Sequence, residues 1–279
     1  RSCLVGSEMC IRDRFKAYRQ AFPLVAAGIF LLFSPIGFAE RDHAKIAIII
    51  DDIGNNTTLG ERAAKLPGAI TYGILPFTPA AKKLSFYATH MDKRKEIIVH
   101  MPMEASHQRE LGEGGLYADY DRQEFLNQLA LALDGLPLAK GLSNHMGSHL
   151  TTMPDRMDWL MDELDRRGLY FIDSKTTRHS AAEQAAQNSD VPYMARDIFL
   201  DHDPSMEAIE LAFEQAVRTA KQTGLAIVIA HPYRSTLTFL EAHLPHIASR
   251  GIELINASEA LKLQTRLQTL AVSDVETKP

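Results

Sequence analysis

From Lys45 onward, short runs of β-branched and aliphatic residues alternate with longer helical stretches. Three runs are entered in the same way: Gly168, Gly224 or Gly251 closes a helical stretch, and an apolar run begins at once. Glycine ends helices readily because it adopts the left-handed backbone conformation. Apolar strands that directly follow helices are typical of a parallel sheet covered on both faces. The alternation therefore predicts an α/β fold with right-handed βα units, and eight such runs are enough to curl into a barrel.

The apolar runs and the stretches between them give the expected elements. We expect strands over 46–50, 70–75, 96–99, 141–143, 169–172, 193–195 with a continuation toward 200, 225–230 and 252–255. We expect helices over 59–66, 79–92, 122–134, 154–167, 205–223, 237–249 and 257–268. Two polar excursions, 104–121 and 174–190, are long for a compact domain, and such loops are usually functional or mobile.

The first 39 residues differ from the rest of the chain. Residues 1–14 show no useful periodicity, and we expect a non-native or unstructured segment there. Residues 15–39 combine basic side chains, an apolar run over 21–33 and small residues up to Ala39, as in a secretory signal peptide. The alternative is an uncleaved membrane anchor, although the apolar run is short for a full span. We therefore expect a periplasmic or secreted domain over 40–268 and a flexible tail over 269–279, with membrane contact only through an uncleaved signal segment.

Composition excludes two classes of function. The only cysteines, Cys3 and Cys10, precede the expected signal segment, so the domain has neither disulfides nor a catalytic thiolate. The formal net charge is −5 and basic residues are dispersed, which argues against a nucleic-acid partner.

Polar residues of metal-binding type follow nearly every expected strand. Asp51-Asp52, His100, Asn144-His145, Asp173, Asp201, His231 and Asn256 stand in these positions. Active sites of parallel α/β folds collect at the carboxyl ends of the strands, because the loops there converge on one face. The pattern predicts a functional site at this end of the sheet.

The pair Asp51-Asp52 is the strongest single signal. Adjacent carboxylates repel each other unless a positive group holds them, and a divalent metal could bind one and leave the other free as a base. The alternative is a solvated turn, since glycine and asparagine follow at once. His145 and His149 have the spacing that places two imidazoles on one helical turn, but Gly147 between them makes a regular helix doubtful. Carboxylate and neutral imidazole together suit Zn²⁺, with Fe, Co, Ni or Mn as alternatives.

An ordered set of motifs resembles the divergent polysaccharide deacetylase family, a remote branch of the NodB-type carbohydrate esterases. The motifs are I-I-I-D-D-I-G, V-H-M-P-M-E, N-H-M-G-S, F-I-D-S-K-T, R-D-I-F-L-D and A-H-P-Y, and the resemblance covers about residues 44–261. It implies a distorted (β/α) barrel with about seven parallel strands and a divalent metal, zinc foremost, held by one Asp and two His.

The resemblance also implies a role for each residue of the metal site. Asp52 and His145 match ligand positions of the family. The third ligand is ambiguous: the NodB-type spacing would select His149, whereas the divergent branch requires no histidine there. We therefore expect His100 as the third ligand, with His149 as the alternative.

Catalysis and substrate binding are carried over in the same way. Asp51 matches the general base and His231 the general acid. The family motifs R-x-P-Y and D-x-x-D-W, which position the base and the partner of the acid, are not found; Asp173, Arg196 and Asp201 are candidate substitutes. We expect Asn144, Asp173 and Arg196 to contact the substrate.

These expectations favour a metal-dependent hydrolase that deacetylates N-acetylated sugars of a cell-envelope polysaccharide or peptidoglycan-type glycan. One alternative is a non-catalytic periplasmic carbohydrate- or envelope-binding module that retains the barrel. Another is a metal-independent glycosidase with Asp51 and Asp173 as its acid/base pair. Tyr117, Tyr120 and Tyr233 are candidate platforms for sugar rings.

Overall fold

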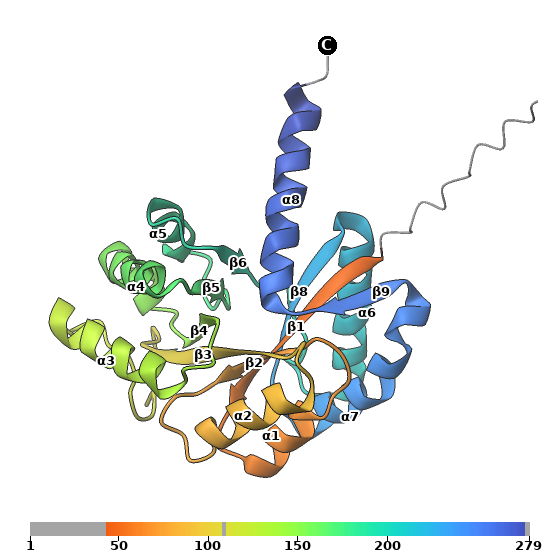
Figure 1. The fold of residues 1–279 in the computed structure, drawn as a ribbon, viewed down its shortest axis with the longest axis horizontal. Coiled ribbons are helices and arrows are strands. Elements are labelled where there is room, and N and C mark those ends of the chain that lie inside the picture. The colour runs from red at the N-terminus through yellow and green to blue at the C-terminus, as the bar shows by residue number, and fades with distance from the viewer. Residues whose placement is uncertain (1–42, 108–109, 277–279) are drawn as a thin grey trace, which may run out of the picture. The chain divides into compact units, whose positions relative to one another are not determined.

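A computed structural model describes residues 43–107 and 110–276, so the predicted signal segment lies outside the described residues. Nine strands form one sheet in which every pairing is parallel (Figure 1). The strands are β1 (Ala44–Ile53), β2 (Thr71–Ile74), β3 (Glu96–Met103), β4 (Gly141–Met146), β5 (Tyr170–Asp173), β6 (Tyr193–Ala195), β7 (Ile198–Phe199), β8 (Leu225–Ala230) and β9 (Ile252–Ile255). Their order is β6-β5-β4-β3-β2-β1-β8-β7, and β9 pairs with β1.

The predicted distorted (β/α) barrel is confirmed, with nine strands rather than about seven. The run predicted over 193–200 forms two strands, because β6 pairs with β5 whereas β7 pairs with β8 at the other end of the sheet. Among the described strands no pairing joins β6 to β7, so the barrel is open along this seam.

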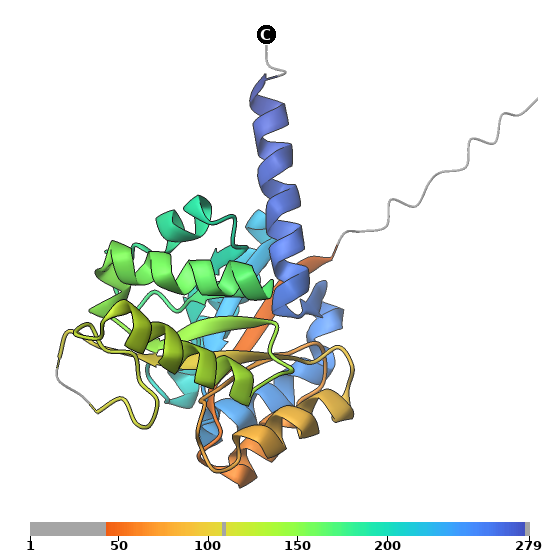
Figure 2. The ribbon, with the colours of Figure 1, turned by 60° about the vertical axis from the view of Figure 1, so that its left-hand side comes forward.

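Most helices cover one face of the sheet, as Figures 1 and 2 show, whereas Ala257, Ala260 and Leu261 of the last helix pack in the cluster on the other face. The α-helices are α1 (Thr57–Ala64), α2 (Ala81–Met91), α3 (Arg122–Gly135), α4 (Pro154–Arg167), α5 (Ala182–Asn188), α6 (Met206–Thr223), α7 (Arg234–His243) and α8 (Ala257–Glu276), and two 3₁₀ turns are η1 (Leu150–Thr152) and η2 (Leu244–Arg250). Gly168, Gly224 and Gly251 have the left-handed backbone predicted for them. None of the described helices is both long and apolar enough to cross a membrane.

Two helical segments occur where a loop or a tail was expected. The helix α5 lies in the excursion over 174–190, where Ala182, Ala185 and Ala186 form its buried stripe. The helix α8 continues beyond residue 268, so the predicted tail is helical as far as Glu276.

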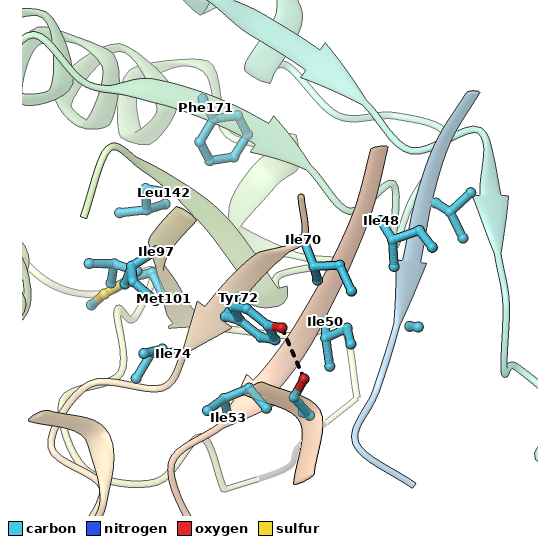
Figure 3. Close-up of a cluster of buried hydrophobic side chains, with 14 of the residues drawn as sticks. Ile48, Ile50, Ile53, Ile70, Tyr72, Ile74, Ile97, Met101, Leu142 and Phe171 are labelled. Carbon is cyan, nitrogen blue, oxygen red and sulfur yellow. Dashed lines mark hydrogen bonds between the residues drawn. The ribbon is translucent and has the colours of Figure 1, made fainter. Parts of the chain in front are cut away.

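The two faces of the sheet bury different sets of side chains. In β1, Ile46, Ile48 and Ile50 pack with the helices, whereas Ala47 and Ile49 belong to the cluster on the opposite face. Successive side chains of a strand point to opposite faces, so a strand covered on both sides is apolar throughout. Figure 3 shows the helix-side cluster, in which the hydroxyl of Tyr72 donates to the carbonyl of Ala63 at 2.9 Å. We call the opposite face the inner face, because the candidate site lies at its carboxyl end.

Candidate metal centre

The strand β1 changes its course where the two aspartates stand. Asp51 follows Ala47 and Ile49 in the alternation and therefore belongs to the inner face. If the alternation continued, Asp52 would point to the helix side. The pairing of β1 with β2, however, shifts register between Ile50 and Ile53. Asp52 also has a left-handed backbone, with φ of 58°. Such irregularities re-aim side chains and are frequent at functional sites. Here the shift lets both carboxylates share one end of the barrel.

The three predicted ligands Asp52, His100 and His145 come together at this point. Asp52 Oδ1 lies 3.2 Å from His100 Nε2 and 2.8 Å from His145 Nδ1. The two imidazole nitrogens are 3.2 Å apart. One atom from each residue can therefore bind the same ion, since all three lie within 4.8 Å of one another.

His149 does not join this group. Its side chain is 44% exposed, and its Nε2 faces Glu104 Oε1 at 4.0 Å. Met146 and Gly147 both have left-handed backbones, which turn the chain out of a helical path directly after His145. The spacing of four residues therefore does not bring the two imidazoles to one ion.

The chemistry of the three atoms fits a divalent cation. Asp52 Oδ1 is buried, and the two imidazole nitrogens converge on it. Burial raises the pKa of the Asp52 carboxyl, but the hydrogen bonds and charges of His100 and His145 outweigh burial and hold this pKa far below its usual range. One carboxylate and two imidazoles are ligands that zinc accepts, and three protein ligands leave one position open.

Ser143 contacts Nδ1 of His100, the ring nitrogen that is not a candidate ligand atom. The sequence did not reveal this role. The Oγ atom of Ser143 lies 2.7 Å from His100 Nδ1 and 3.4 Å from Asp51 Oδ1. A partner on the second ring nitrogen fixes the orientation of a metal-binding imidazole and the nitrogen that carries its proton. The backbone alternation supports this arrangement, because Ser143 and His145 stand on the same face of β4.

Asp51 is buried beside the cluster and has a free oxygen. Its Oδ2 atom accepts no hydrogen bond. Burial raises the pKa of Asp51, and the charges of His100 and His231 offset only part of this effect. Gly73 on β2 provides the room, because a side chain at Gly73 would overlap Asp51 Oδ1. A buried carboxylate with an unused oxygen can accept a proton.

His231 lies on the opposite side of Asp52, fixed by Asp201. The His231 Nδ1 atom is 2.9 Å from Asp201 Oδ1. The other oxygen of Asp201 accepts from the backbone N–H of His231 at 2.7 Å and from the hydroxyl of Thr236 at 2.8 Å. The free Nε2 of His231 lies 3.9 Å from Asp52 Oδ2. Burial lowers the pKa of His231, but the hydrogen bond and charge of Asp201 outweigh burial, and the pKa is raised.

Two aromatic rings flank this imidazole. Tyr233 stacks on His231 with a centroid distance of 5.5 Å, and the ring of Phe199 lies at 5.2 Å. The Tyr233 side chain is exposed, so it remains a candidate platform beside the site.

The three side chains predicted to bind substrate form hydrogen bonds within the protein. Asn144 is buried and bonds the carbonyl of Met146 and the N–H of Ser174. Asp173 is buried and accepts from the N–H of Lys175 and the hydroxyl of Tyr193. Arg196 is half-buried, donates to the carbonyls of Ser174 and Lys175 and lies over the ring of Phe199. These contacts indicate structural roles, and substrate binding by the three residues stays a prediction.

The alternation of the strands explains these contacts for two of them. Asn144 stands on the same face of β4 as Leu142, and Asp173 on the same face of β5 as Phe171; both neighbours pack on the helix side. Side chains on that face point away from the metal site. Because Asp173 lies on that face, it is turned away from Asp51, and the two do not form the acid/base pair of the glycosidase alternative.

A cleft of about 530 Å³ opens beside Asp52 and His145. Phe77 forms part of its wall, 38% exposed and with φ of 63°. A left-handed backbone is a genuine outlier for a bulky residue, and such strain clusters at ligand sites. The ring lies against Gly114, where a side chain would overlap it. Nothing in the sequence distinguished Phe77 apart from the prolines around it.

Comparison with known proteins places this geometry in context. The sequence pattern of divergent polysaccharide deacetylases matches residues 48–261. The chain is 30% identical over 238 residues to the uncharacterized protein YibQ of Escherichia coli strain K12, covering 85% of this chain and 72% of that protein. It is 31% identical over 216 residues to an uncharacterized protein of Haemophilus influenzae, covering 77% and 75%.

Solved structures share the fold at lower sequence identity. The uncharacterized protein ATU2773 of Agrobacterium tumefaciens superposes with a TM-score of 0.75 at 20% identity, covering 78% of this chain and 89% of that chain. The peptidoglycan deacetylase PdaC of Bacillus subtilis superposes with a TM-score of 0.50 at 13% identity, covering 84% and 99%. At these identities the likeness concerns the fold alone.

Proposed function

Because this chain belongs to the divergent polysaccharide deacetylase family, we propose that it is a metal-dependent hydrolase. It removes the acetyl group from the nitrogen of an amino sugar in a cell-envelope glycan. The observation that carries the proposal is the convergence of Asp52, His100 and His145 beside the unpaired oxygen of Asp51. The fold shared with a peptidoglycan deacetylase supports a glycan as the substrate class, and the predicted signal segment over 15–39 supports a periplasmic location.

Asp52, His100 and His145 would hold the divalent ion, for which we propose zinc. Such an ion lowers the pKa of a bound water and polarises a carbonyl group. Ser143 keeps the His100 ring in place, so that Nε2 rather than Nδ1 faces Asp52 and would bind the ion.

Two residues of the chain would move protons. Asp51 accepts a proton from the attacking water, since its Oδ2 atom has no other partner. The water oxygen bonds to the acetyl carbon, the bond between this carbon and the sugar nitrogen breaks, and acetate leaves. His231 Nε2 donates a proton to the departing amine, while Asp201 holds the proton on Nδ1. Proton transfer by a positioned group typically contributes about 10²–10⁴-fold to the rate.

The second candidate is a glycan-binding module without catalysis. It is favoured by the surroundings of Asp51, because no arginine pairs with this carboxylate in the part of the chain that the structure describes. Arg196, a candidate substitute for the family motifs that are not found, donates to backbone carbonyls instead.

Acetate release from tetra-N-acetylchitotetraose and from peptidoglycan fragments separates the two candidates. We expect release by the parent protein, loss after chelation and recovery when zinc is added back. The variant Asp51→Asn should keep its metal but release acetate at least a hundredfold more slowly. Release that survives both chelation and Asp51→Asn would contradict the proposed mechanism. Glycan binding by the metal-loaded parent without acetate release would establish the second candidate.

A further inference from the structure

The helix α2 packs beside α1 on the helix side of the sheet (Figure 2). The side of α2 that is buried consists of Ala81, Leu84, Ser85 and Ala88. The other side consists of two rows of residues at a spacing of four, which lie along one face of a helix. The rows are Lys82-Phe86-His90 and Lys83-Tyr87-Met91. We call these six residues, together with Lys93 just beyond the helix, the α2 face.

Two large apolar side chains of the α2 face are open to solvent. Phe86 is 48% exposed and Met91 is 50% exposed. Tyr87 lies between them and is half-buried against the core. Single exposed apolar side chains are common and need no explanation. Phe86 and Met91 therefore support an interaction surface only in combination with the charges around them.

The charges of the α2 face are positive. The helix contains two lysines and no aspartate or glutamate, although the whole chain has a formal net charge of −5. Two acidic side chains contact this region, and each is already paired at 2.6 Å: Glu61 with Lys83, and Asp92 with Arg94. Lys82 and Lys93 are exposed, and neither forms a hydrogen bond or an ion pair with the residues that the structure describes. Both remain available to an anionic partner.

Lysines interleaved with exposed apolar side chains fit the surface of an anionic lipid bilayer. Anionic headgroups attract lysine and arginine, and apolar side chains enter the boundary between headgroups and acyl chains. A soluble anionic polymer would attract Lys82 and Lys93 equally well, but it offers no apolar layer to Phe86 and Met91. Lipid therefore accounts for both features of the face, and a polymer for only one.

We propose that the α2 face docks the protein on a membrane that contains anionic lipid. Lys82 and Lys93 contact the headgroups, and Phe86 and Met91 lie at the boundary with the acyl chains. The inference concerns a surface outside the metal centre and does not depend on the proposed function.

A polarity-sensitive fluorescent label tests this docking in the full-length chain. The label is attached to Phe86→Cys in a background in which Cys3 and Cys10 are replaced by serine. The matched control carries it at Leu211→Cys, an exposed apolar position of α6. The vesicles contain phosphatidylcholine alone or phosphatidylcholine with an equal part of phosphatidylglycerol. We expect the emission of the label at position 86 to shift to shorter wavelength with the anionic vesicles only, and the label at position 211 to remain unchanged.

Charge reversal tests the contribution of the lysines. In the labelled Phe86→Cys protein, Lys82→Glu combined with Lys93→Glu should raise the lipid concentration at half-saturation at least about tenfold. The control combines Arg218→Glu with Lys221→Glu, which changes the net charge equally on the exposed side of α6. This control should respond like the labelled parent, and thermal unfolding shows whether each variant is folded.

Four outcomes would overturn the inference. The label at position 211 could shift as much as the label at position 86, or vesicles of phosphatidylcholine alone could produce the full shift. The reversal of Lys82 and Lys93 could have no more effect than its control. Finally, position 86 could respond to dextran sulfate but not to anionic vesicles, which would identify the partner as a soluble anionic polymer.

Discussion

Gly73 lies so close to Asp51 that any side chain at Gly73 would overlap the Oδ1 atom of the aspartate. Gly73 stands in the middle of β2, where a glycine weakens the strand and is common where another group approaches closely. The glycine is thus explained by the buried carboxylate beside it rather than by a turn.

Replacing this glycine should therefore damage the site more than the fold. In Gly73→Ala we expect acetate release to fall at least tenfold and the free energy of unfolding to drop by about 1–3 kcal/mol, as for other overpacked cores. The matched control is Gly135→Ala in α3, where an added Cβ meets nothing within 4 Å. Acetate assays and denaturant unfolding measure both effects. Equal behaviour of the two variants would contradict the contact with Asp51.

The hydroxyl of Thr236 should matter to catalysis through Asp201 and His231. In Thr236→Val, Asp201 loses a hydrogen bond at 2.8 Å, and we expect kcat to fall about tenfold with KM and metal content unchanged. Thr238→Val is the control, because Thr238 lies in the same helix but bonds Arg62 and the carbonyl of Arg234. The variant His231→Ala should lose about 10²–10⁴-fold in kcat. A fall in kcat of the same size in both threonine variants would refute the positioning role of Thr236.

The aromatic ring of Phe77 should contribute to substrate binding. Asparagine tolerates the left-handed backbone better than phenylalanine, so Phe77→Asn removes the ring and eases strain of about 1–2 kcal/mol. We expect KM to rise about tenfold while the unfolding temperature stays the same or increases, and Phe77→Tyr should keep the KM of the parent. A lower unfolding temperature with an unchanged KM would identify the ring as core packing only.

Buried Lys95 should make stability depend on pH. Its ammonium donates to the carbonyls of Ala64 and Leu66, and burial lowers the pKa of Lys95 to about 8. Above pH 8 the folded protein has released this proton, whereas an unfolded lysine keeps it to about pH 10.4. The unfolded state therefore binds more protons in this window, and stability from this group increases with pH by at most about 1.4 kcal/mol per unit.

Unfolding of the parent and of Lys95→Met between pH 7 and 10.5 measures this effect. Other titrating groups are common to both proteins, so the difference between their free energies of unfolding isolates Lys95. We expect this difference to be constant below pH 8 and to shift in favour of the parent from pH 8 to 10. A difference that does not change with pH would mean that the pKa of Lys95 is ordinary.

Local patterns in the sequence were sufficient to predict the fold, whereas the ligands of the candidate metal centre were assigned through the family resemblance. Apolar runs after glycine-terminated helices predicted the parallel sheet. Asp51, His100 and His145 stand on its inner face within β1, β3 and β4, and His231 follows β8 directly. Position after a strand was not enough for Asn144 and Asp173. The period-two alternation, which is also visible in the sequence, places these two on the helix side.

Other features depend on tertiary context and could not be read from the chain. Strand alternation alone would point Asp52 away from the site, and only the register shift and left-handed backbone bring it back. The spacing of His145 and His149 is typical of a shared helical turn, which Gly147 made doubtful, and the left-handed backbones of Met146 and Gly147 do leave that path. The course of the chain from β6 to β7 across the open seam likewise depends on pairing with strands that are distant in sequence.

The metal content of single-residue variants tests the central claim most directly. After saturation with zinc and removal of free metal, elemental analysis should find one ion per chain in the parent and in His149→Ala. Asp52→Ala, His100→Asn and His145→Asn should each retain less than a tenth of that amount while still unfolding cooperatively. A full complement of zinc in Asp52→Ala, or its loss in His149→Ala, would contradict the assignment of the ligands.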